Sequence, residues 1–423
     1  MAMAGKVRIM LSGNFFADDL EWVQGGSELQ VDIVNMDTKG SPEDMDAFYD
    51  KLYKCDLFVV QWEAYAVQRL FARHSSDKRF MEFMTSPNVK RVFWSMDSHH
   101  QWPVEQKLQS FFHTIYTAHS NYIDRLEEGK GVWLPCYWQH GSRKQLWAES
   151  NVTVEPSYDI VSAFQAYLGI GDRNIIMAKC MHLLEKSQLS YFLGNVSSER
   201  SCNALRSGKV VLNVSIMDDL NLRNIEAIAL NKVMLASRVP DHDKLDLDYR
   251  NTVFFNRDMS DFLEALDMAL TLASTERPST VENILDHHML MHRYITMFNR
   301  ELGLNLRGLP FEKVGLPNTE KQSFIVDLQA GDIVFSPVDL SLKAVWCHLN
   351  YDQDQDAFSE LQWLCKQESE KLQDHQDFIL QLFMRILHRE FKESSLGYQV
   401  LLLSLSSMVM EKSIQSVMKN EWC

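Results

Sequence analysis

Short apolar runs alternate with segments of helical spacing along residues 7–274, and this alternation constrains the fold more than any other feature of the chain. In the first round the apolar runs lie at 7–11, 31–34, 57–60, 92–94, 115–116 and 132–134. Helical spacing occurs between them near 43–53, 63–84, 103–112 and 119–128. Such alternation is typical of a doubly wound parallel sheet with helices on its faces.

A second round of the same pattern follows residues 151–156, which have the character of a linker. Its apolar runs lie at 160–164, 191–193, 210–214, 233–236 and 253–255, and its helical segments near 172–186, 198–207, 220–230 and 258–274. Two successive α/β units of domain size predict two lobes with a cleft between them. We therefore expect one lobe at 1–150 and the other at 151–301.

The chain changes character after the second round. Two prolines and three glycines fall within residues 302–322, which predicts a connection between domains. Beyond it, 323–423 reads as an α-helical extension with helical patterns at 341–349, 356–371, 375–392 and 395–411. This extension could dock a partner protein or form a dimer.

Charge and cysteine usage exclude several classes of protein. The formal net charge of −15 argues against a chain whose main task is to bind nucleic acid or an anionic membrane. The seven cysteines never form a CxxC pair, which argues against a zinc ribbon or a disulfide framework. No apolar run reaches the length of a transmembrane helix, and the N-terminus lacks a signal-peptide pattern. We expect a cytoplasmic protein without a membrane span.

One polar block stands between the apolar runs at 210–214 and 233–236. It contains Asp218, Asp219, Asn221, Arg223 and Glu226, in a loop and the first turns of a predicted helix. In an open parallel sheet, ligands bind at the carboxyl ends of the strands and at the helix N-termini beside them. The block is therefore well placed to hold a nucleotide.

This block also carries a family resemblance. Asp219-Leu-Asn221-Leu-Arg223-Asn-Ile-Glu226-Ala-Ile-Ala resembles the Asp-x-Asn-Met-Arg-x-x-Glu-Ala-x-Ala block of spore-maturation-type (CgeB-like) glycosyltransferases. Three further segments resemble the family in the same order, at 93–100, 132–135 and 288–294. The resemblance implies a GT-B fold of two Rossmann-like lobes. It also implies a sugar transferred from a nucleotide diphosphate to a hydroxyl of a protein or glycan acceptor, with no metal and no further cofactor.

The resemblance assigns the donor ribose to Glu226, whereas from position alone this residue is an ordinary first-turn acid that favours the helix dipole. The family block places its acid at Asp219. The spacing of Asp218 from Glu226 matches instead the paired glutamates of retaining GT-B enzymes, and either aspartate could cap the helix. Arg223 could face the diphosphate or form a salt bridge with Asp219. With Asn221, these residues are the predicted donor site.

A metal-independent transferase needs cations or helix amides for its leaving diphosphate. Gly169-Ile-Gly171-Asp172-Arg173 precedes a predicted helix that carries Lys179. Gly171 would permit close backbone approach, and Arg173 could bind phosphate bidentately. The alternatives are a surface role for Arg173 and a solvated Lys179.

The acceptor side of the cleft falls after strands of the first lobe. Asp97, His99 and His100 follow the run at 92–94, and His119 follows the next one. A histidine there could deprotonate the acceptor hydroxyl, because its pKa lies near neutral pH. A structural cluster is the alternative. Metal binding by Asp97, His99 and His100 is a third reading, which we set aside because adjacent ligands without a distant partner rarely form a site.

Two further features complete the prediction. Gly13 and Asn14 follow the first strand, where GT-B lobes often approach a substrate, although a tight turn explains them equally well. Asn231 stands where the family has glycine, and asparagine tolerates the left-handed conformation that ends such a helix. We expect a glycosyltransferase. The alternatives are an inactive GT-B-like scaffold and a nucleotide-sugar epimerase of the GT-B type.

Overall fold

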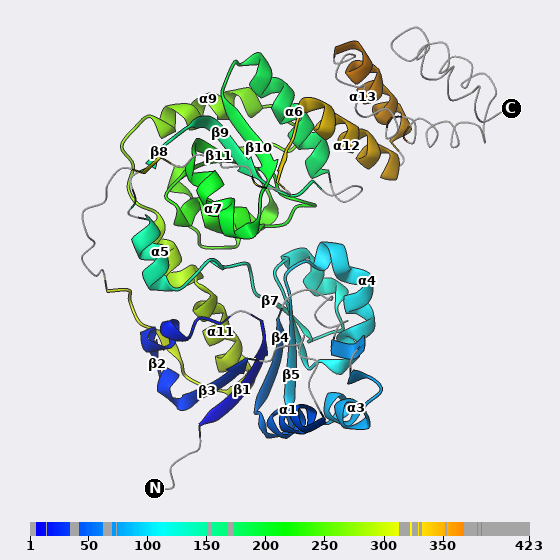
Figure 1. Cartoon of the computed structure of the whole chain (residues 1–423), viewed down its shortest axis with the longest axis vertical. Coiled ribbons are helices and arrows are strands. Elements are labelled where there is room, and N and C mark those ends of the chain that lie inside the picture. Colours follow the sequence, from blue (N-terminus) through cyan, green and yellow to red (C-terminus); the bar gives the residue numbers. More distant parts are fainter. Residues whose placement is uncertain are drawn as a thin grey trace, which may run out of the picture.

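A computed structural model gives the fold. It describes residues 6–13, 15–33, 42–61, 70–72, 74–150, 152, 154–166, 172–312, 322–323, 329, 332–351, 353–367, 379 and 382. These residues form two α/β lobes, one above the other in Figure 1, with two further helices beside the upper lobe. The two rounds of alternation in the sequence correspond to the two lobes.

The first lobe is built on a six-stranded parallel sheet with the strand order β3-β1-β4-β5-β6-β7. Its strands are β1 (Val7–Ser12), β3 (Leu29–Ile33), β4 (Leu57–Gln61), β5 (Lys90–Ser95), β6 (Thr114–Thr117) and β7 (Gly131–Trp133). Its helical segments are η1 (Ala17–Trp22), η2 (Gly26–Glu28), α1 (Pro42–Lys54), α3 (Lys78–Thr85), α4 (Ser98–Leu108), η3 (Gln109–Phe111) and η4 (Ser120–Arg125). All six predicted strands are confirmed.

The second lobe has the strand order β13-β12-β11-β9-β10-β16, parallel except for β16 at the edge. Its strands are β9 (Tyr158–Ala163), β10 (Tyr191–Asn195), β11 (Gly208–Asn213), β12 (Val233–Ser237), β13 (Thr252–Phe255) and β16 (Ile333–Val334). Its helical segments are α6 (Arg173–Lys186), α7 (Ser198–Arg206), α8 (Leu222–Ala229), η5 (Pro240–Asp243), η6 (Tyr249–Asn251), α9 (Phe262–Ala273), α10 (Val281–Asn283) and the π-helical turn η7 (Ile284–His288).

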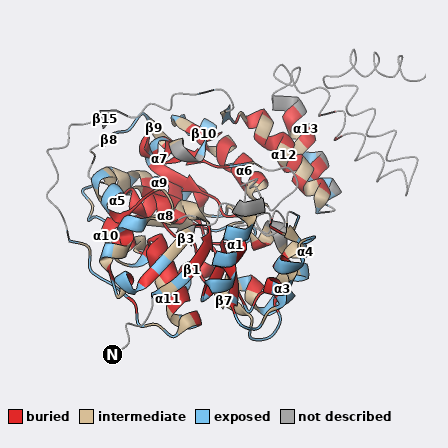
Figure 2. Ribbon diagram, turned by 60° about the horizontal axis from the view of Figure 1, so that its bottom comes forward, coloured by how far each residue is buried: buried red, intermediate tan, exposed pale blue. Residues whose placement is uncertain are grey.

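Burial explains why these strands read as continuous apolar runs. Both faces of each sheet are covered by helices, so a central strand such as β4 is buried along its whole length. In Figure 2 the central strands are buried, whereas a surface helix such as α3 alternates buried and exposed residues. Phe58 and Phe93 of the first sheet pack with Phe80 and Phe83 of α3 in one apolar cluster. Two doubly wound lobes of this kind confirm the predicted GT-B-like architecture.

The helix α11 (Leu290–Leu302) leaves the second lobe and packs on the first. The Tyr294 hydroxyl donates to Gln61 Oε1 at 2.6 Å, and the Tyr116 hydroxyl donates to Glu301 Oε1 at 2.8 Å. The apolar side of α11 is buried in the same cluster as the strands of the first sheet. The predicted boundary at 301 therefore differs from the structure, where 290–302 lie with the first lobe.

Short elements connect the lobes. They are α5 (Arg143–Ser150), β8 (Val154–Glu155), which pairs with β15 (Gln322–Ser323), and β14 (Arg307–Gly308), which pairs with β2 (Val23–Gln24). The predicted connection at 302–322 thus adds a strand pair to the first lobe before it reaches residues outside the described part.

The described part of the C-terminal extension is attached to the second lobe. It contains α12 (Pro337–Asn350), which packs against α6, and α13 (Asp354–Gln367), which packs against α12. Ser336 and Asp339 form a capping box at the start of α12. The predicted helices at 341–349 and 356–371 are confirmed in type, and those at 375–392 and 395–411 fall outside the described residues except for 379 and 382.

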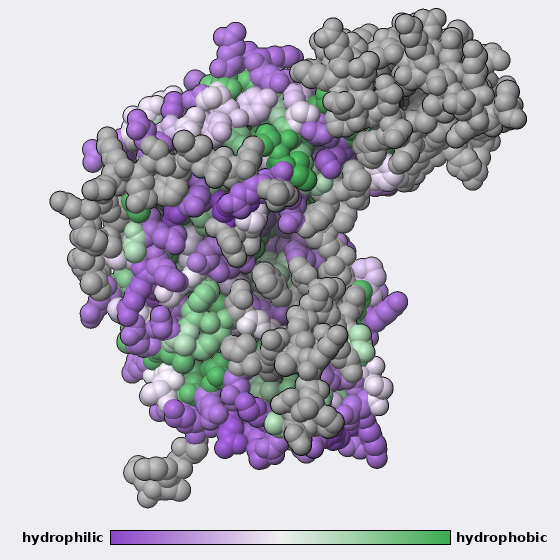
Figure 3. All heavy atoms as spheres, viewed as in Figure 1, coloured by the Kyte–Doolittle hydropathy of each residue, from purple (hydrophilic) through white to green (hydrophobic). Residues whose placement is uncertain are grey.

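Three predicted helices differ from the structure. The one predicted at 63–84 is interrupted by a turn at 75–77 before α3 begins at Lys78, and 62–69 fall outside the described residues. The segment predicted at 119–128 is the short 3-10 helix η4, because it fills a brief connection between neighbouring strands β6 and β7. The helix predicted at 103–112 begins earlier, at Ser98, and carries Pro103 inside it. Within the described residues no helix is long and apolar enough to span a membrane. Figure 3 shows hydrophilic residues over most of the visible described surface.

Candidate functional site

A pocket of about 330 Å³ lies between the lobes, at the carboxyl ends of β5, β6, β9 and β11. The first lobe contributes residues that follow β5 and β6: Met96, Asp97, His99, Ala118 and His119. The second lobe contributes residues after β9 and β11 and at the starts of α6 and α8, among them Gln165, Arg173, Asn213, Asp219, Asn221 and Arg223. Ligands of open α/β sheets bind at such a place.

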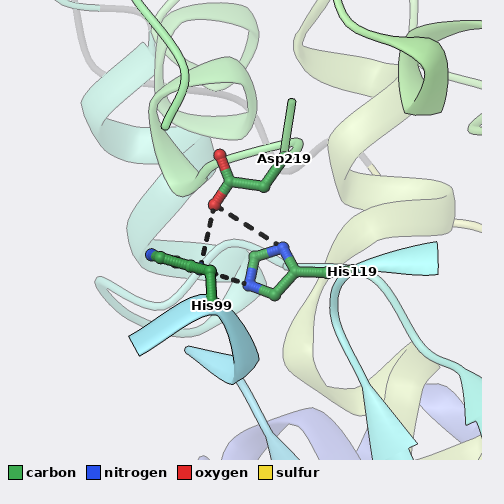
Figure 4. Close-up of side chains that lie close together, drawn as sticks. All are labelled: His99, His119 and Asp219. Atoms are coloured by element: carbon green, nitrogen blue, oxygen red, sulfur yellow. Dashed lines mark hydrogen bonds and ion pairs between the residues drawn. The ribbon is translucent and has the colours of Figure 1, made fainter. Parts of the chain in front are cut away.

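Three of these side chains lie close together, as Figure 4 shows. Asp219 Oδ2 of the second lobe lies 3.4 Å from His99 Nδ1 and 3.5 Å from His119 Nδ1, both of the first lobe. His99 Nδ1 also lies 3.1 Å from His119 Nε2. All three side chains are almost fully buried, so their polar atoms interact in a poorly hydrated environment.

Backbone groups orient two of the three side chains. The carbonyl oxygen of Met96 lies 2.9 Å from His119 Nε2, so this nitrogen carries the hydrogen in a neutral ring and Nδ1 is left as an acceptor. The Ile216 N–H donates to Asp219 Oδ1 at 3.1 Å. Burial lowers the pKa of His119 to about 4. Burial also raises the pKa of Asp219 to about 7, although the charge of Arg173 acts in the opposite direction.

Asp218, the alternative to Asp219, lies outside this pocket. Its carboxylate Oδ1 is 3.3 Å from Arg257 Nε, and its side chain lines a separate groove beside α12 and α13. The backbone explains the difference, because Asp218 has a φ of 61° and turns the two neighbouring carboxylates in different directions.

Glu226 forms a buried ion pair that the sequence did not indicate. Its Oε1 lies 2.6 Å from His140 Nε2, and its Oε2 pairs with Arg223 Nη1. Arg223 lines the pocket and pairs with Glu226, so the alternative of a salt bridge to Asp219 is wrong. Glu226 itself stands behind Arg223 and is not among the residues that line the pocket.

The charges of this pair follow from its surroundings. Burial by itself would raise the pKa of Glu226, but Arg223 and His140 outweigh it and lower the pKa. Burial likewise would lower the pKa of His140, but hydrogen bonds to Cys202 and Glu226 raise it to about 10. His140 is therefore a cation at neutral pH. His140 was not among the predicted site residues. The one feature of the sequence that could have indicated it is its position just after the 132–135 segment, where the chain crosses between the lobes.

Asn221 caps the helix that carries Arg223 and Glu226. Its side-chain oxygen accepts from the Arg223 N–H at 3.1 Å, which makes it the N-cap of α8. Its Nδ2 donates to Asn213 Oδ1 at 3.0 Å, at the end of β11. The cap thus fixes the direction in which α8 leaves the strand, and with it the position of Arg223 at the pocket wall.

The residues predicted to bind the diphosphate do not all lie at the pocket. Arg173, the first residue of α6, lines the pocket and donates to the carbonyl oxygen of Gln165. Lys179, on the same helix, is exposed and lines the separate groove beside α12 and α13. Gly171 falls outside the described residues. Only Arg173 of this set is brought to the pocket within the described part of the chain.

The residues predicted to contact the acceptor also do not all lie at the pocket. Asp97 lines the pocket beside His99 and His119, whereas the side chain of His100 lies outside the described set. Gly13 does not line the pocket, and it has a packing role, since a Cβ there would lie 2.2 Å from Gln61 Oε1. Asn14 falls outside the described residues.

Asn231, the departure from the family pattern, has the left-handed conformation that glycine would adopt, with a φ of 51°. Its side-chain oxygen accepts from Asn251 Nδ2 at 3.2 Å. The prediction that asparagine preserves this turn is confirmed.

Comparisons with known proteins find a family similarity over part of the second lobe and α11. Residues 181–299 match a family model described as "Glycosyl transferase-like". No curated protein matches the sequence.

Several solved structures resemble the chain at low identity. A sucrose-phosphate synthase from Thermosynechococcus elongatus is 12% identical, with a TM-score of 0.38 over 71% of this chain and 90% of that one. A glycosyltransferase from Rickettsia africae is 11% identical, with a TM-score of 0.40 over 70% and 90%. The catalytic domain of starch synthase IV from Arabidopsis thaliana is 10% identical, with a TM-score of 0.40 over 62% and 78%. Residues 181–299, which contain α8 and β12, are thus the part of the chain that is glycosyl transferase-like in sequence.

Proposed function

We propose that this chain transfers a glycosyl group from a nucleotide diphosphate sugar to an acceptor hydroxyl, in the pocket between its lobes. The observation that carries this proposal is the composition of that pocket. Two arginines and a helix N-terminus lie on the side of the second lobe, and an aspartate and two histidines lie on the side of the first. The family match over residues 181–299 supports the same activity.

The second lobe would hold the donor. In the reaction the bond between the sugar and the diphosphate breaks, and the diphosphate leaves with increased negative charge. Arg173, Arg223 and the first N–H groups of α6 would stabilise that charge, since pre-oriented donors and cations act strongly in a site that excludes water. In this proposal the diphosphate needs no metal ion.

Glu226 would act on the donor indirectly. It positions Arg223 at the pocket wall through their ion pair, and it does not itself line the pocket.

The first lobe would bring the acceptor. Asp97 and His99 line the pocket from the first lobe and Arg173 lines it from the second, so an acceptor hydroxyl beside Asp97 or His99 would lose its proton as it attacks the sugar. Either group would have to be within hydrogen-bond reach of that hydroxyl, which is the geometric condition for general base catalysis.

One arginine variant and one lysine variant, both on α6, test the donor site. Arg173→Ala removes a charged contact worth about 1.5–3 kcal/mol, so it should weaken binding of UDP, GDP, ADP or TDP by about 10- to 100-fold in calorimetry. Lys179→Ala is the matched control on α6, and it should bind as the unaltered protein does because Lys179 lines another groove. Equal binding by both variants, or no binding of any nucleotide, would overturn the proposal.

Product analysis separates transfer from the other functions of a GT-B-like protein. Mass spectrometry with each donor and with glycan and protein acceptors should detect a glycosylated acceptor. Nucleotide binding without turnover would indicate a scaffold that has lost catalysis. A changed sugar nucleotide in the absence of acceptor would indicate an epimerase.

A further inference from the structure

The cluster of His99, His119 and Asp219 has properties that the transfer reaction does not require. Each residue offers one ligand atom, and these atoms all lie within 4.8 Å of one another. The two histidines come from the first lobe and the aspartate from the second, so the cluster bridges the lobes (Figure 4). In the sequence, a metal site at Asp97, His99 and His100 lacks a distant ligand, and the fold supplies two distant ligands to His99.

Two of the separations between these atoms are close to those of ligands around a tetrahedral zinc ion. Zn–N and Zn–O bonds of about 2.0–2.1 Å place two ligand atoms about 3.3 Å apart. In the structure Asp219 Oδ2 is 3.4 Å from His99 Nδ1 and 3.5 Å from His119 Nδ1. An O–H···N hydrogen bond would need a shorter contact, near 2.5–3.0 Å, so a shared proton explains these distances less well.

The chemistry of the facing atoms points to the same ligand. His119 Nδ1 is buried without a hydrogen-bond partner, and its lone pair faces the carboxylate oxygen of Asp219. Two electron-rich atoms at this separation repel each other, and a cation between them converts the repulsion into two bonds.

Backbone groups orient two of the ligand side chains, as the groups that surround metal ligands do in known metal sites. The Met96 carbonyl fixes the His119 tautomer, and the Ile216 N–H holds Oδ1 of Asp219, which leaves Oδ2 for the ion. Two imidazoles and one carboxylate suit zinc better than magnesium, which prefers oxygen ligands. The pocket beside the cluster leaves room for water as a fourth ligand.

We propose that His99, His119 and Asp219 bind a divalent ion of the zinc class that joins the two lobes and inhibits the enzyme. The ion would replace the contact between the two histidines with bonds to both of them. Inhibition follows because His99 can no longer serve the acceptor and the lobes can no longer separate; this part rests on the proposed function. The binding itself does not.

Metal binding is measured without any substrate. After dialysis against Zn²⁺, elemental analysis of the full chain should find one equivalent of zinc. Co²⁺ in its place should show the strong visible absorption of a tetrahedral site. Asp219→Asn and His99→Ala should each weaken binding by more than about 100-fold, since the loss of an outer-shell partner alone costs 10–100-fold.

A second measurement guards against variants that fold poorly. Zinc should raise the melting temperature of the unaltered protein and of the control His287→Ala, whose side chain is exposed outside the cluster, but not that of Asp219→Asn. The proposal is overturned by a protein without bound zinc, or by variants of the cluster that bind it as tightly as the control.

The activity test is separate. Zinc at one equivalent should lower the transfer rate, and a chelator should restore it. A rate that zinc leaves unchanged overturns the inhibitory part. Zinc binding in a protein that shows no transfer with any donor supports the site and counts against the proposed function instead.

Discussion

At the scale of single residues, His140 and Glu226 form a buried ion pair beside Arg223, which lines the pocket. Glu226 is almost completely buried, and Arg223 and His140 together satisfy it from two sides. A buried carboxylate without such partners would be strongly destabilising, because burial disfavours the charged form. The pair therefore links the segment between the lobes to the helix that presents Arg223.

The pKa values of this pair predict how stability depends on pH. The pKa of His140 rises from 6.5 to about 10 on folding, so its contribution is fully present below pH 6.5 and is lost as the pH rises towards 10. The pKa of Glu226 is lowered, so its contribution is present above 4.5 and is lost as the pH falls through the folded value.

His140→Gln tests this dependence. It should cost about 1.5–3 kcal/mol of unfolding free energy at pH 6, because a hydrogen bond to a charged group is removed. The loss should shrink at pH 9 to 10, and urea denaturation at both pH values measures it. The exposed His287→Gln is the control. If His140→Gln and the unaltered protein lost stability in parallel between pH 6 and 10, the ion pair would not carry the effect.

At the scale of the elements, α11 holds the molecule together by crossing from one lobe to the other. Arg293 donates to the carbonyl oxygens of Pro135, Cys136 and His287 at 2.9, 2.9 and 3.1 Å. These carbonyls belong to the segment between the lobes and to the turn before α11. The buried guanidinium of Arg293 thus fixes α11 against the segment between the lobes, which also carries His140.

Arg293→Leu should therefore destabilise the protein by about 3 kcal/mol or more, since it leaves several buried acceptors without a donor. Arg300→Leu is the matched control on the same helix. Arg300 is exposed and contacts Glu301 only at 3.8 Å, so its replacement should change stability by less than about 0.5 kcal/mol. Thermal or urea unfolding compares the two, and equal effects would show that the carbonyl contacts of Arg293 contribute little.

At the scale of the whole molecule, polar contacts join the lobes beside the pocket. The Ser120 N–H of the first lobe donates to Asp241 Oδ2 of the second at 3.1 Å, and the Ser120 hydroxyl donates to the same carboxylate. Lys244 pairs with Asp241 at 3.0 Å and also reaches Ser120. Ser120 follows His119 of the pocket, so separation of the lobes to exchange ligands would have to break these contacts.

Asp241→Ala removes the acceptor that Ser120 and Lys244 share. The separated state should become more populated, and small-angle X-ray scattering should record a larger radius of gyration with each lobe still folded. Asp243→Ala is the control, because Asp243 pairs with Arg238 at 2.8 Å within the second lobe. Identical scattering from the two variants would contradict a role for Asp241 in holding the lobes together.

Much of this architecture is predictable from local pattern. The alternation of apolar runs locates the major strands of both sheets, because strands buried on both faces must be apolar throughout. The same reasoning places Asp219, Asn221 and Arg223 at a strand end, where the structure has β11, a loop and α8. The family resemblance adds the GT-B-like pairing of the lobes, which periodicity cannot supply.

The meeting of particular side chains is decided only by tertiary packing. His99 and His119 follow different strands of one lobe, and Asp219 follows a strand of the other, so their contact depends on how the two sheets face each other. The same holds for His140 with Glu226 and for α11 on the first lobe. The amino-acid sequence alone determined most strands and helices of the two lobes and the junctions that carry polar groups, because burial and backbone preference act over short distances. Which of those groups share one pocket was decided by the packing of the two lobes, because contacts between distant segments depend on the shapes of surfaces that form only after each lobe has folded.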